Sequence, residues 1–513
     1  ILKEITREEL LKAVGCSSSV LKAVCERGLL EEYEKTVDRI PTASIPASLI
    51  LQPLSDAQQT AMLQIRDVWR EKDVCLLHGV TSSGKTEIYI HLINEVLAQG
   101  KQVLYMLPEI VLTSQLTERL RKVFGDRLGV YHSRYTDAER VEVYRKQISD
   151  TPYDIIVGVR SSVLLPFHNL GMVIIDEEHE TSFKQTEPAP RYHARNVALV
   201  MARMSGAKTL LGTATPSLES YSNAVAGKYG YVSMTTRFGN VCMPEIEVVD
   251  IAELKRKKLM NGPFSPVLLR EIRQALERKE QVILFQNRRG FAPVVECHVC
   301  GWTPQCPHCD VSLTFHKRSN SLTCHYCGFS TSVAQRCPQC DADRLSSKGY
   351  GTERIEDVLA SIFPDARVAR MDLDTTRSRS AYEGIIKGFQ RGDTDILIGT
   401  QMVTKGLDFR RVSVVGILNA STMLNQPDFR SYERAYQMMT QVAGRAGRSS
   451  AGNGQNVRPG RVILQVHDAK QPTVMQVVRG DFEGMFRTQM EERRLFMYPP
   501  LCRLVYVYIK HKD

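Results

Sequence analysis

One eight-residue loop restricts the fold of this 513-residue chain more than any other feature. The loop matches the pattern G-x-x-x-x-G-K-[ST] and consists of Gly79, Val80, Thr81, Ser82, Ser83, Gly84, Lys85 and Thr86. An apolar segment, residues 74–78, precedes it, and a helical pattern, residues 87–97, follows it. Glycines let such a loop wrap closely around phosphate oxygens, while its N–H groups and the following helix N-terminus face the anion. The pattern therefore predicts a parallel α/β domain that binds a nucleoside triphosphate, with Lys85 reaching the phosphates.

Short apolar segments alternate with helical patterns along most of the chain. They include residues 103–107 and 173–175 in the first half, and 282–285 and 412–418 in the second. Such alternation is typical of parallel sheets covered by helices on both faces. We therefore predict an α/β fold with two lobes of this kind.

Composition and charge narrow the class of protein further. Apolar residues make up 43% of the chain and charged residues 24%, as in globular proteins. The sequence has neither an apolar run long enough to span a bilayer nor a signal-peptide pattern, so we expect a cytoplasmic protein with no membrane partner. The net charge of +10 fits a polyanionic partner, or simply a basic enzyme.

A second candidate element is an acidic box that follows the apolar segment 172–175. It begins with Asp176 and Glu177 and ends at His179. A strand that ends in acidic residues delivers them to the carboxyl edge of a parallel sheet, where such folds bind ligands. We predict that Asp176 and Thr86 hold Mg²⁺ and that Glu177 is the general base for an attacking water. The alternative is a solvated acidic helix start that the helix dipole stabilises.

A third candidate element lies near the end of the second predicted lobe. It runs from Gln441 through Arg445 to Arg448, with glycines beside both arginines. Glycines permit close backbone approach, and a guanidinium that reaches across a cleft stabilises charge in phosphoryl transfer. Arg445 and Arg448 are therefore candidate catalytic arginine fingers, with Arg448 the first choice. The alternative is a solvated basic loop.

Eight of the 13 cysteines form four C-x-x-C pairs in one short segment. The pairs are Cys297/Cys300, Cys306/Cys309, Cys324/Cys327 and Cys337/Cys340. Two such pairs make one closed tetrahedral site with Zn–S distances of about 2.3 Å, so eight cysteines predict two structural Zn²⁺ ions. Crowded cysteines in a cytosolic chain favour metal over disulfides.

The spacing also bears on how the cysteine pairs combine. Fourteen residues separate Cys309 from Cys324, close to a zinc-ribbon spacing, which favours a nested arrangement. In that arrangement the two inner pairs share one zinc and the two outer pairs share the other. Sequential pairing is the alternative. Three histidines lie inside the pairs and are interpreted as bystanders: His298, His308 and His325.

The N-terminal residues predict a small helical unit. Helical patterns over residues 6–14 and 18–27 flank a Gly-Cys-Ser turn, which is the outline of a helix-turn-helix, and a wing is expected around residues 31–40. The alternative is an ordinary helical hairpin. The segment that follows, before the first lobe, is rich in Pro, Ser and Thr and is predicted to be a linker.

The three motifs, in this order, are motifs I, II and VI of superfamily 2 helicases, and the chain resembles the bacterial primosomal protein N′ family of replication-restart helicases. The cysteine block inside the second lobe makes this resemblance specific. Further stretches similar to the family's motifs are residues 54–58, 107–113, 158–162, 212–217, 399–409 and 498–500. The first of them contains Gln58, which the resemblance makes an adenine-reading residue, and Gln441 is likewise expected to contact the nucleotide.

The resemblance implies two RecA-like lobes, the cofactors ATP, Mg²⁺ and two Zn²⁺, and the nested zinc pairing. Compared with the domain organisation of the family, we expect this chain to be a fragment that lacks the N-terminal DNA-binding domain and most of the C-terminal domain. The expected division is 1–42 partial winged helix, 43–53 linker, 54–230 first lobe, 231–291 second lobe (first part), 292–345 zinc-binding insertion, 346–470 second lobe (second part) and 471–513 start of the C-terminal domain.

The segment after the acidic box mixes basic and aromatic side chains, which suits a single strand of nucleic acid. Its candidate DNA-coupling residues are Phe183, Lys184, Arg191, Tyr192 and Arg195. The alternative is a surface loop that packs its own rings.

The resemblance implies a DNA helicase that moves 3′ to 5′, restarts replication at collapsed forks and assembles the primosome. It also implies a nucleoid location and, as partners, single-stranded and forked DNA, primosome proteins and single-stranded DNA-binding protein. Two alternatives stay open: an RNA-directed helicase, and a fork-binding scaffold that does not hydrolyse ATP.

Overall fold

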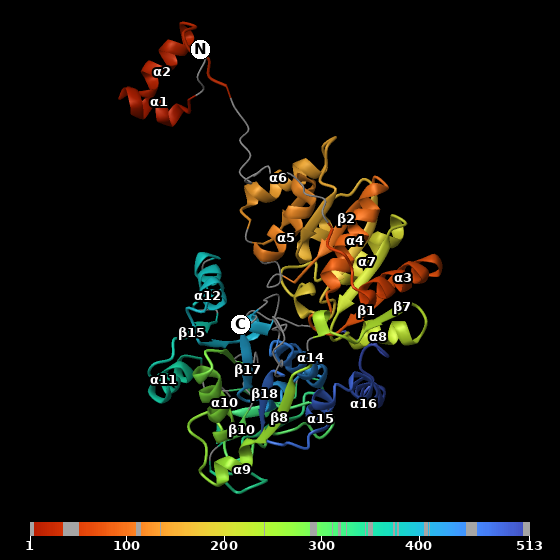
Figure 1. Cartoon of the computed structure of the whole chain (residues 1–513), viewed down its shortest axis with the longest axis vertical. Helices are drawn as coiled ribbons and strands as arrows, with labels where there is room; N and C mark the ends of the chain where they lie inside the picture. The colour runs from red at the N-terminus through yellow and green to blue at the C-terminus, as the bar shows by residue number, and fades with distance from the viewer. Residues whose placement is uncertain are drawn as a thin grey trace.

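The computed structural model describes residues 5–33, 51–108, 114–133, 135–240, 242–287, 295–309, 311–316, 320–324, 326–343, 345–346, 352–372, 375–376, 379–404, 409, 411–447 and 459–505. These residues form two α/β lobes, one above the other in Figure 1, and a cysteine-rich module that interrupts the second lobe. The predicted fold class is thereby confirmed. None of the described helices combines the length and the apolar character needed to cross a bilayer.

The first lobe is built on a seven-stranded sheet in the order β3-β4-β2-β5-β6-β1-β7, with every neighbouring pair parallel. Its central strands are apolar throughout, because helices cover both faces of a parallel sheet. The strands are β1 Val74–Gly79, β2 Gln102–Met106, β3 Leu128–Tyr131, β4 Ile155–Gly158, β5 Leu170–Asp176, β6 Lys208–Thr213 and β7 Gly230–Met234. The helices are α3 Asp56–Glu71, α4 Lys85–Ala98, α5 Ser114–Phe124, α6 Asp137–Gln147, α7 Ala194–Met204 and α8 Leu218–Val225.

The second lobe has a six-stranded parallel sheet in the order β15-β16-β9-β17-β18-β8. Its strands are β8 Glu245–Asp250, β9 Gln281–Phe285, β15 Val368–Met371, β16 Ile396–Gly399, β17 Val412–Ile417 and β18 Arg461–Val466. Its helices are α9 Ile251–Arg256, α10 Pro266–Glu277, α11 Thr352–Ile362, α12 Arg379–Arg391, α13 Ser421–Leu424, α14 Ser431–Ala443, α15 Pro472–Arg479 and α16 Phe482–Leu495.

The cysteine-rich module contains only short antiparallel strands among its described residues. Strand β10 (Glu296–Cys297) pairs with β14 (Leu345–Ser346), and β12 (Ser321–Thr323) lies between β11 (Thr314–His316) and β13 (Ser330–Ser332). These short strands enclose only a small apolar cluster, which includes Val311, Leu313 and Leu322, so we expect the module to depend on its cysteines for stability.

We propose a change to two of the expected domain boundaries. Strand β7 pairs with β1 up to Met234, so we propose that the first lobe extends at least to that residue rather than ending at residue 230. Within the segment 471–513, α15 and α16 contribute buried residues to the cluster that joins the two lobes, including Val474, Phe482 and Met485. We propose that these helices belong to the motor rather than to a separate domain.

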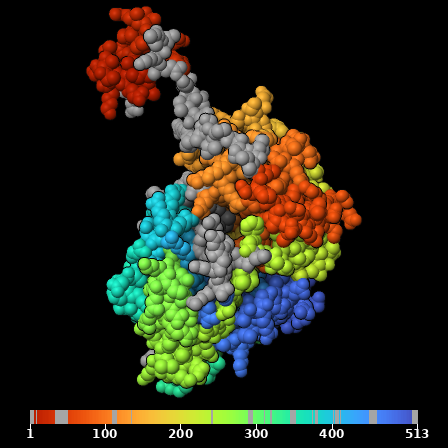
Figure 2. Space-filling view, in the orientation of Figure 1, coloured from red at the N-terminus to blue at the C-terminus, as the bar shows by residue number. Residues whose placement is uncertain are grey.

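Two helices precede the first lobe. Helix α1 (Arg7–Val14) starts with a capping box between Thr6 and Glu9, and Gly15 ends it at a φ of 67°. Helix α2 (Ser18–Glu26) follows directly. Figures 1 and 2 show this pair, in red, apart from the lobes. Most of the predicted wing, residues 31–40, lies outside the described residues.

Candidate active site and metal centres

The phosphate-binding loop joins the end of β1 to the start of α4, as its motif requires. Two of its residues adopt left-handed backbone conformations, Ser82 with a φ of 63° and Gly84 with a φ of 83°. These turns fold the loop back over the N-terminus of α4, where backbone N–H groups and the helix dipole favour an anion. Lys85 Nζ donates a hydrogen bond to the carbonyl oxygen of Gly79 at 2.7 Å, so its ammonium lies inside the loop.

Gln58 lies against this loop, although its contacts differ from those of an adenine reader. Its Nε2 donates to the carbonyl oxygen of Gly84 at 3.0 Å, and its Oε1 accepts from Ser55 N–H at 2.9 Å. The side chain is 1% exposed. In this structure Gln58 therefore ties α3 to the phosphate-binding loop, and reading adenine would require its amide to be released.

The acidic box lies at the same carboxyl edge of the sheet as the loop. Asp176 ends β5, and its Oδ1 accepts hydrogen bonds from Tyr89 Oη at 3.1 Å and from Glu177 N–H at 3.1 Å. Burial raises the pKa of Asp176 to about 7; the neighbouring Glu177 adds to this effect and Lys85 opposes it. A hard cation would relieve the cost of this charge, so the residues present fit Mg²⁺.

A glutamine of the second lobe contacts the acidic box directly. Gln441 Nε2 lies 3.3 Å from Oε2 of Glu177 and 2.8 Å from Nε2 of His179. His179 Nδ1 lies 2.7 Å from Oγ1 of Thr213, at the end of β6. A tautomer with the proton on Nδ1 satisfies both histidine contacts. Gln441, predicted to contact nucleotide, thus links the two lobes at the candidate base, Glu177.

The glycine-flanked arginine segment approaches the phosphate-binding loop closely. A Cβ atom at Gly444 would lie 2.4 Å from Thr81 Oγ1, so only glycine fits there. The neighbouring Arg445 is 8% exposed. Arg448 lies outside the described residues. The structure therefore places the buried Arg445 directly beside Gly444, the residue of this segment that meets the phosphate-binding loop.

Arg237 is an interface residue that no sequence pattern indicated. Its Nη2 lies 3.5 Å from Thr81 Oγ1 and 3.4 Å from the carbonyl oxygen of Gly444, and Nη1 reaches the carbonyl oxygen of Ala446 at 3.3 Å. The side chain is buried. It holds the loop of one lobe to the arginine segment of the other, over a sequence separation that leaves no local signal.

The resemblance implies ATP hydrolysis, and we expect Gly444→Ala to lower that turnover by about tenfold or more, because the added methyl group forces the arginine segment away from Thr81 by a misplacement of the order of 1 Å. Steady-state hydrolysis assays measure the loss. Gly384→Ala, in α12 with open space around its Cβ position, is the matched control and should leave turnover unchanged. Equal rates for the two variants would contradict the close approach.

The candidate DNA-coupling residues divide into two groups. Phe183 is fully buried in the core of the lobe. Arg195 is 8% exposed, and its Nη1 donates to Glu178 Oε2 at 2.5 Å and to Ser217 Oγ at 2.7 Å. Both side chains are engaged inside the protein, so a role of these two residues in DNA coupling would have to be indirect.

The other three candidates of this loop stay available as strand contacts. Lys184 and Arg191 are exposed and Tyr192 is half-buried. Arg160 holds the loop, with Nη1 3.2 Å from the carbonyl oxygen of Lys184. A strand passing this surface could meet two positive charges beside one ring.

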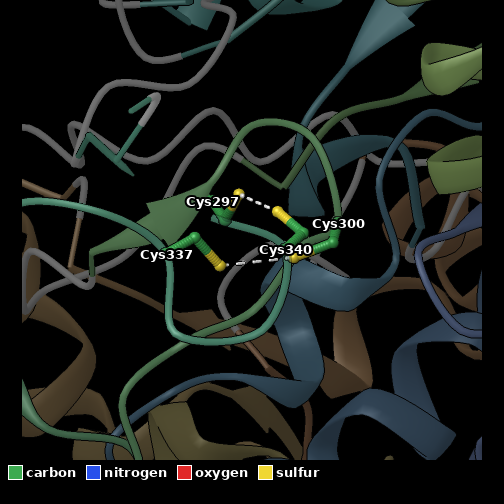
Figure 3. A group of neighbouring side chains, drawn as sticks. All are labelled: Cys297, Cys300, Cys337 and Cys340. Carbon is green, nitrogen blue, oxygen red and sulfur yellow. Dashed lines mark hydrogen bonds between the residues drawn. The ribbon is translucent and has the colours of Figure 1, made fainter. Parts of the chain in front are cut away.

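The eight cysteines group in the nested order. One cluster contains Cys297, Cys300, Cys337 and Cys340, and the other contains Cys306, Cys309, Cys324 and Cys327, with all sulfur atoms of a cluster within 4.8 Å of one another. Figure 3 shows the outer four converging from two loops. The described histidines His298 and His308 belong to neither cluster. His325 lies outside the described residues.

The sulfur separations fit zinc better than disulfides. Sγ–Sγ distances are 3.6 Å for Cys297–Cys340, 3.6 Å for Cys300–Cys337 and 3.5 Å for Cys306–Cys327. A tetrahedron with Zn–S bonds of about 2.3 Å has edges of roughly 3.8 Å, whereas a disulfide needs about 2.05 Å. With four thiolates each, the clusters fit closed structural sites.

Backbone turns prepare the thiolates for a metal. The residue after the second cysteine is left-handed in three pairs: Gly301 at φ 78°, Gly328 at φ 77° and Asp341 at φ 56°. Each donates its N–H to the carbonyl oxygen of the first cysteine of its pair, as Gly301 does to Cys297 at 2.9 Å. These tight knuckles hold both sulfur atoms of a pair on one side of the chain.

We expect two zinc ions per purified chain, measured by elemental analysis. Cys306→Ser should lower the content to one, because three thiolates hold the inner ion poorly, while the outer cluster keeps its own. Cys242→Ser, at an exposed cysteine outside both clusters, should retain two. A single zinc in the unmodified chain would contradict the paired clusters.

Comparisons with known proteins agree with this arrangement. Family models match for the DEAD/DEAH box helicase at residues 55–224 and for the helicase conserved C-terminal domain at 350–450. Two more specific models also match: the Cys-rich region domain of PriA DNA helicase at residues 306–331, and the winged helix domain of PriA helicase from Bacteroidota at 1–37. The two lobes and their motifs define a superfamily 2 helicase.

Curated relatives identify the family. The replication restart protein PriA of Bacillus subtilis is 42% identical over 99% of this chain and 62% of that protein. The proteins of the same name from Rickettsia felis and Rickettsia conorii are 37% and 36% identical, over 91% and 94% of this chain and 70% and 72% of theirs. This chain belongs to the family of replication restart protein PriA, which confirms the resemblance drawn from the motifs. It spans less than two thirds of the Bacillus subtilis relative.

Proposed function

We propose that this chain is an ATP-driven DNA helicase motor that moves 3′ to 5′ along single-stranded DNA and opens the duplex ahead of it. The contact of Gln441 with Glu177 carries this proposal. It places a side chain of the second lobe on the candidate base of the first, so that closing the lobes and activating water become one event. A scaffold that does not hydrolyse ATP would have no use for such a contact.

The chain's own residues divide the chemistry as follows. Lys85 releases the carbonyl oxygen of Gly79 and binds the β- and γ-phosphates, while the N–H groups of the loop hold the remaining oxygens. Glu177 orients the attacking water and takes its proton. One of the two arginine fingers, Arg448 as the first choice or Arg445, stabilises the charge that develops on the transferring group.

Thr86 and Asp176 would hold Mg²⁺, which when bound neutralises charge on the phosphate oxygens. Because the pKa of Asp176 is raised to about 7, a fraction of the carboxyl groups carries a proton near neutral pH. Binding of the cation therefore displaces a proton from this site, and its affinity should rise with pH.

Membership of the PriA family supports the wider role. We propose that the motor acts on forked DNA at stalled or collapsed replication forks, in the cytoplasm near the nucleoid. Primosome proteins and single-stranded DNA-binding protein are the proposed partners. The net charge of +10 fits the phosphate backbone of such substrates.

Unwinding assays test the proposal. Duplexes with a 3′ tail on DNA, a 5′ tail on DNA, or a 3′ tail on RNA are offered with ATP, and strand separation is followed by fluorescence. We expect opening of the 3′-tailed DNA substrate alone. Preference for the 5′ tail would overturn the polarity, preference for RNA would overturn the substrate, and ATP-independent binding without turnover would favour a scaffold.

A further inference from the structure

One buried carboxylate at the lobe interface joins three segments of the chain. Glu433, in α14 of the second lobe, is 3% exposed. Its Oε1 accepts a hydrogen bond at 3.0 Å from the N–H of Leu218, the first residue of α8 in the first lobe. Its Oε2 accepts a hydrogen bond at 2.6 Å from Nη2 of Arg493 in α16.

The amide beside that of Leu218, the N–H of Ser217, is bound to the acidic box. Ser217 N–H donates to Glu178 Oε1 at 2.7 Å, and the hydroxyl of Ser217 donates to Oε2 at 2.9 Å. Glu178 directly follows Glu177, the candidate base. Consecutive amides at the positive end of α8 are therefore held by two carboxylates, one from each lobe. A shift of Glu433 acts one residue away from the anchor of Glu178.

Arg493 is fixed from several sides. It is 1% exposed, and its Nη1 donates to the carbonyl oxygen of Pro499 at 2.9 Å. Its guanidinium carbon lies 5.2 Å from the centre of the Phe429 ring. The Phe429 ring in turn stacks on that of Tyr498, with 4.7 Å between the ring centres. Its centre lies 6.3 Å from that of Tyr326, which is located between two cysteines of the inner cluster. The cysteine-rich module and the turn that contains Tyr498 and Pro499 thus meet at this arginine.

The other end of α16 makes apolar contacts with the first lobe. The ring centre of Phe482 lies 4.9 Å from that of Tyr221 in α8 and 6.0 Å from that of Tyr436 in α14, and Phe486 lies 4.8 Å from Tyr221. Figure 1 shows α16 beside α8 and α14. The blue surface of this segment adjoins the yellow-green surface of the first lobe in Figure 2. Helix α16 therefore spans the interface, and Arg493 is its buried polar end.

We propose that Arg493 is a positioning residue. It couples the position of α16 to the acidic box through Glu433 and the N-terminus of α8. Opening of the lobes moves Glu433 away from Leu218 and loosens the Ser217–Glu178 anchor beside the base. Closure restores both contacts and aligns Glu177 for turnover. This inference rests on the proposed ATP-driven function and names the elements that tie turnover to lobe closure.

The kinetic test compares Arg493→Met with Arg493→Lys. We expect the methionine variant to lose about tenfold in DNA-stimulated kcat, a larger loss than in the DNA-free rate, with KM for ATP within about twofold of the unmodified chain. The lysine variant keeps the charge and should recover most of the rate. Arg367→Met removes the pair between the exposed Arg367 and the half-buried Asp395, beside the start of β15 at the edge of the second sheet, and should change neither rate.

A double-mutant cycle tests whether the two residues act as a unit. Glu433→Gln and Arg493→Met together should be no slower than the slower single variant, since one connection is broken in either case. Additive losses would overturn the proposal. Equal loss of the stimulated and DNA-free rates would also overturn it, because it would indicate a merely structural role.

Amide hydrogen exchange supplies a readout that does not need ATP turnover. Protection of Leu218 N–H should fall in Arg493→Met, and in Glu433→Gln if the methionine variant does not fold, and should stay unchanged in Arg367→Met. Unchanged protection in the interface variants overturns the proposed connection. If the variants show this exchange pattern but the unmodified chain hydrolyses no ATP, the proposed function is overturned instead. The two failures are therefore distinguishable.

Discussion

Lys85→Ala should reduce ATP turnover by about two to three orders of magnitude, the loss expected when one donor to developing charge is removed from a preorganised site. The ammonium lies inside the phosphate-binding loop, 2.7 Å from the carbonyl oxygen of Gly79, and Lys85 is the first residue of helix α4. A steady-state phosphate-release assay measures the change. Binding of single-stranded DNA, followed by fluorescence anisotropy, should persist because the loop faces nucleotide rather than the strand.

The matched control is Lys257→Ala. This lysine lies in the second lobe in an exposed pair with Glu253, so its loss removes the same charge without touching the loop. Turnover should stay within about twofold, since such surface pairs contribute little. A Lys85→Ala protein that hydrolyses ATP at a near-normal rate would remove the loop from the proposed mechanism.

Glu177→Gln should lower hydrolysis by about 10²–10⁴-fold while nucleotide binding is retained, because only the proton acceptor is lost. The amide has nearly the shape of the carboxylate and still offers an oxygen to Gln441. Single-turnover hydrolysis and binding of a fluorescent nucleotide separate the two effects. Loss of nucleotide binding together with hydrolysis would mean that Glu177 is a structural residue.

The neighbouring carboxylate provides a contrast. Burial alone would raise the pKa of Glu178, but the Arg195 guanidinium and hydrogen bonds from Ser217 and Ser220 hold it below its ordinary value. Glu178→Gln should therefore lower the free energy of unfolding by about 2 kcal/mol, because it leaves buried donors poorly paired. Glu177→Gln should leave stability nearly unchanged. Thermal melting of both variants distinguishes a base from an anchor, although the two residues are adjacent.

The sequence by itself determined the elements whose partners lie close along the chain. The phosphate-binding loop needs only a strand, eight residues and a helix, and β1 and α4 occur where the motif predicts them. The spacing between Cys309 and Cys324 favoured the nested pairing that the sulfur positions show. Short-range geometry dictates these sites, because backbone turns and bond lengths fix which side chains can meet.

Only the tertiary structure decided which side chains the protein keeps for itself. Phe183 and Arg195 are residue types that are typical of a strand-binding loop. In the structure Phe183 fills the core and Arg195 forms an ion pair with Glu178. The interface depends on pairs such as Leu218 and Glu433, 215 residues apart in the chain. Such pairs leave no local pattern, because their proximity arises only when both sheets have formed and the two lobes pack together. For that reason Arg237 and Arg493 carried no sequence signal, whereas the loop and the cysteines did.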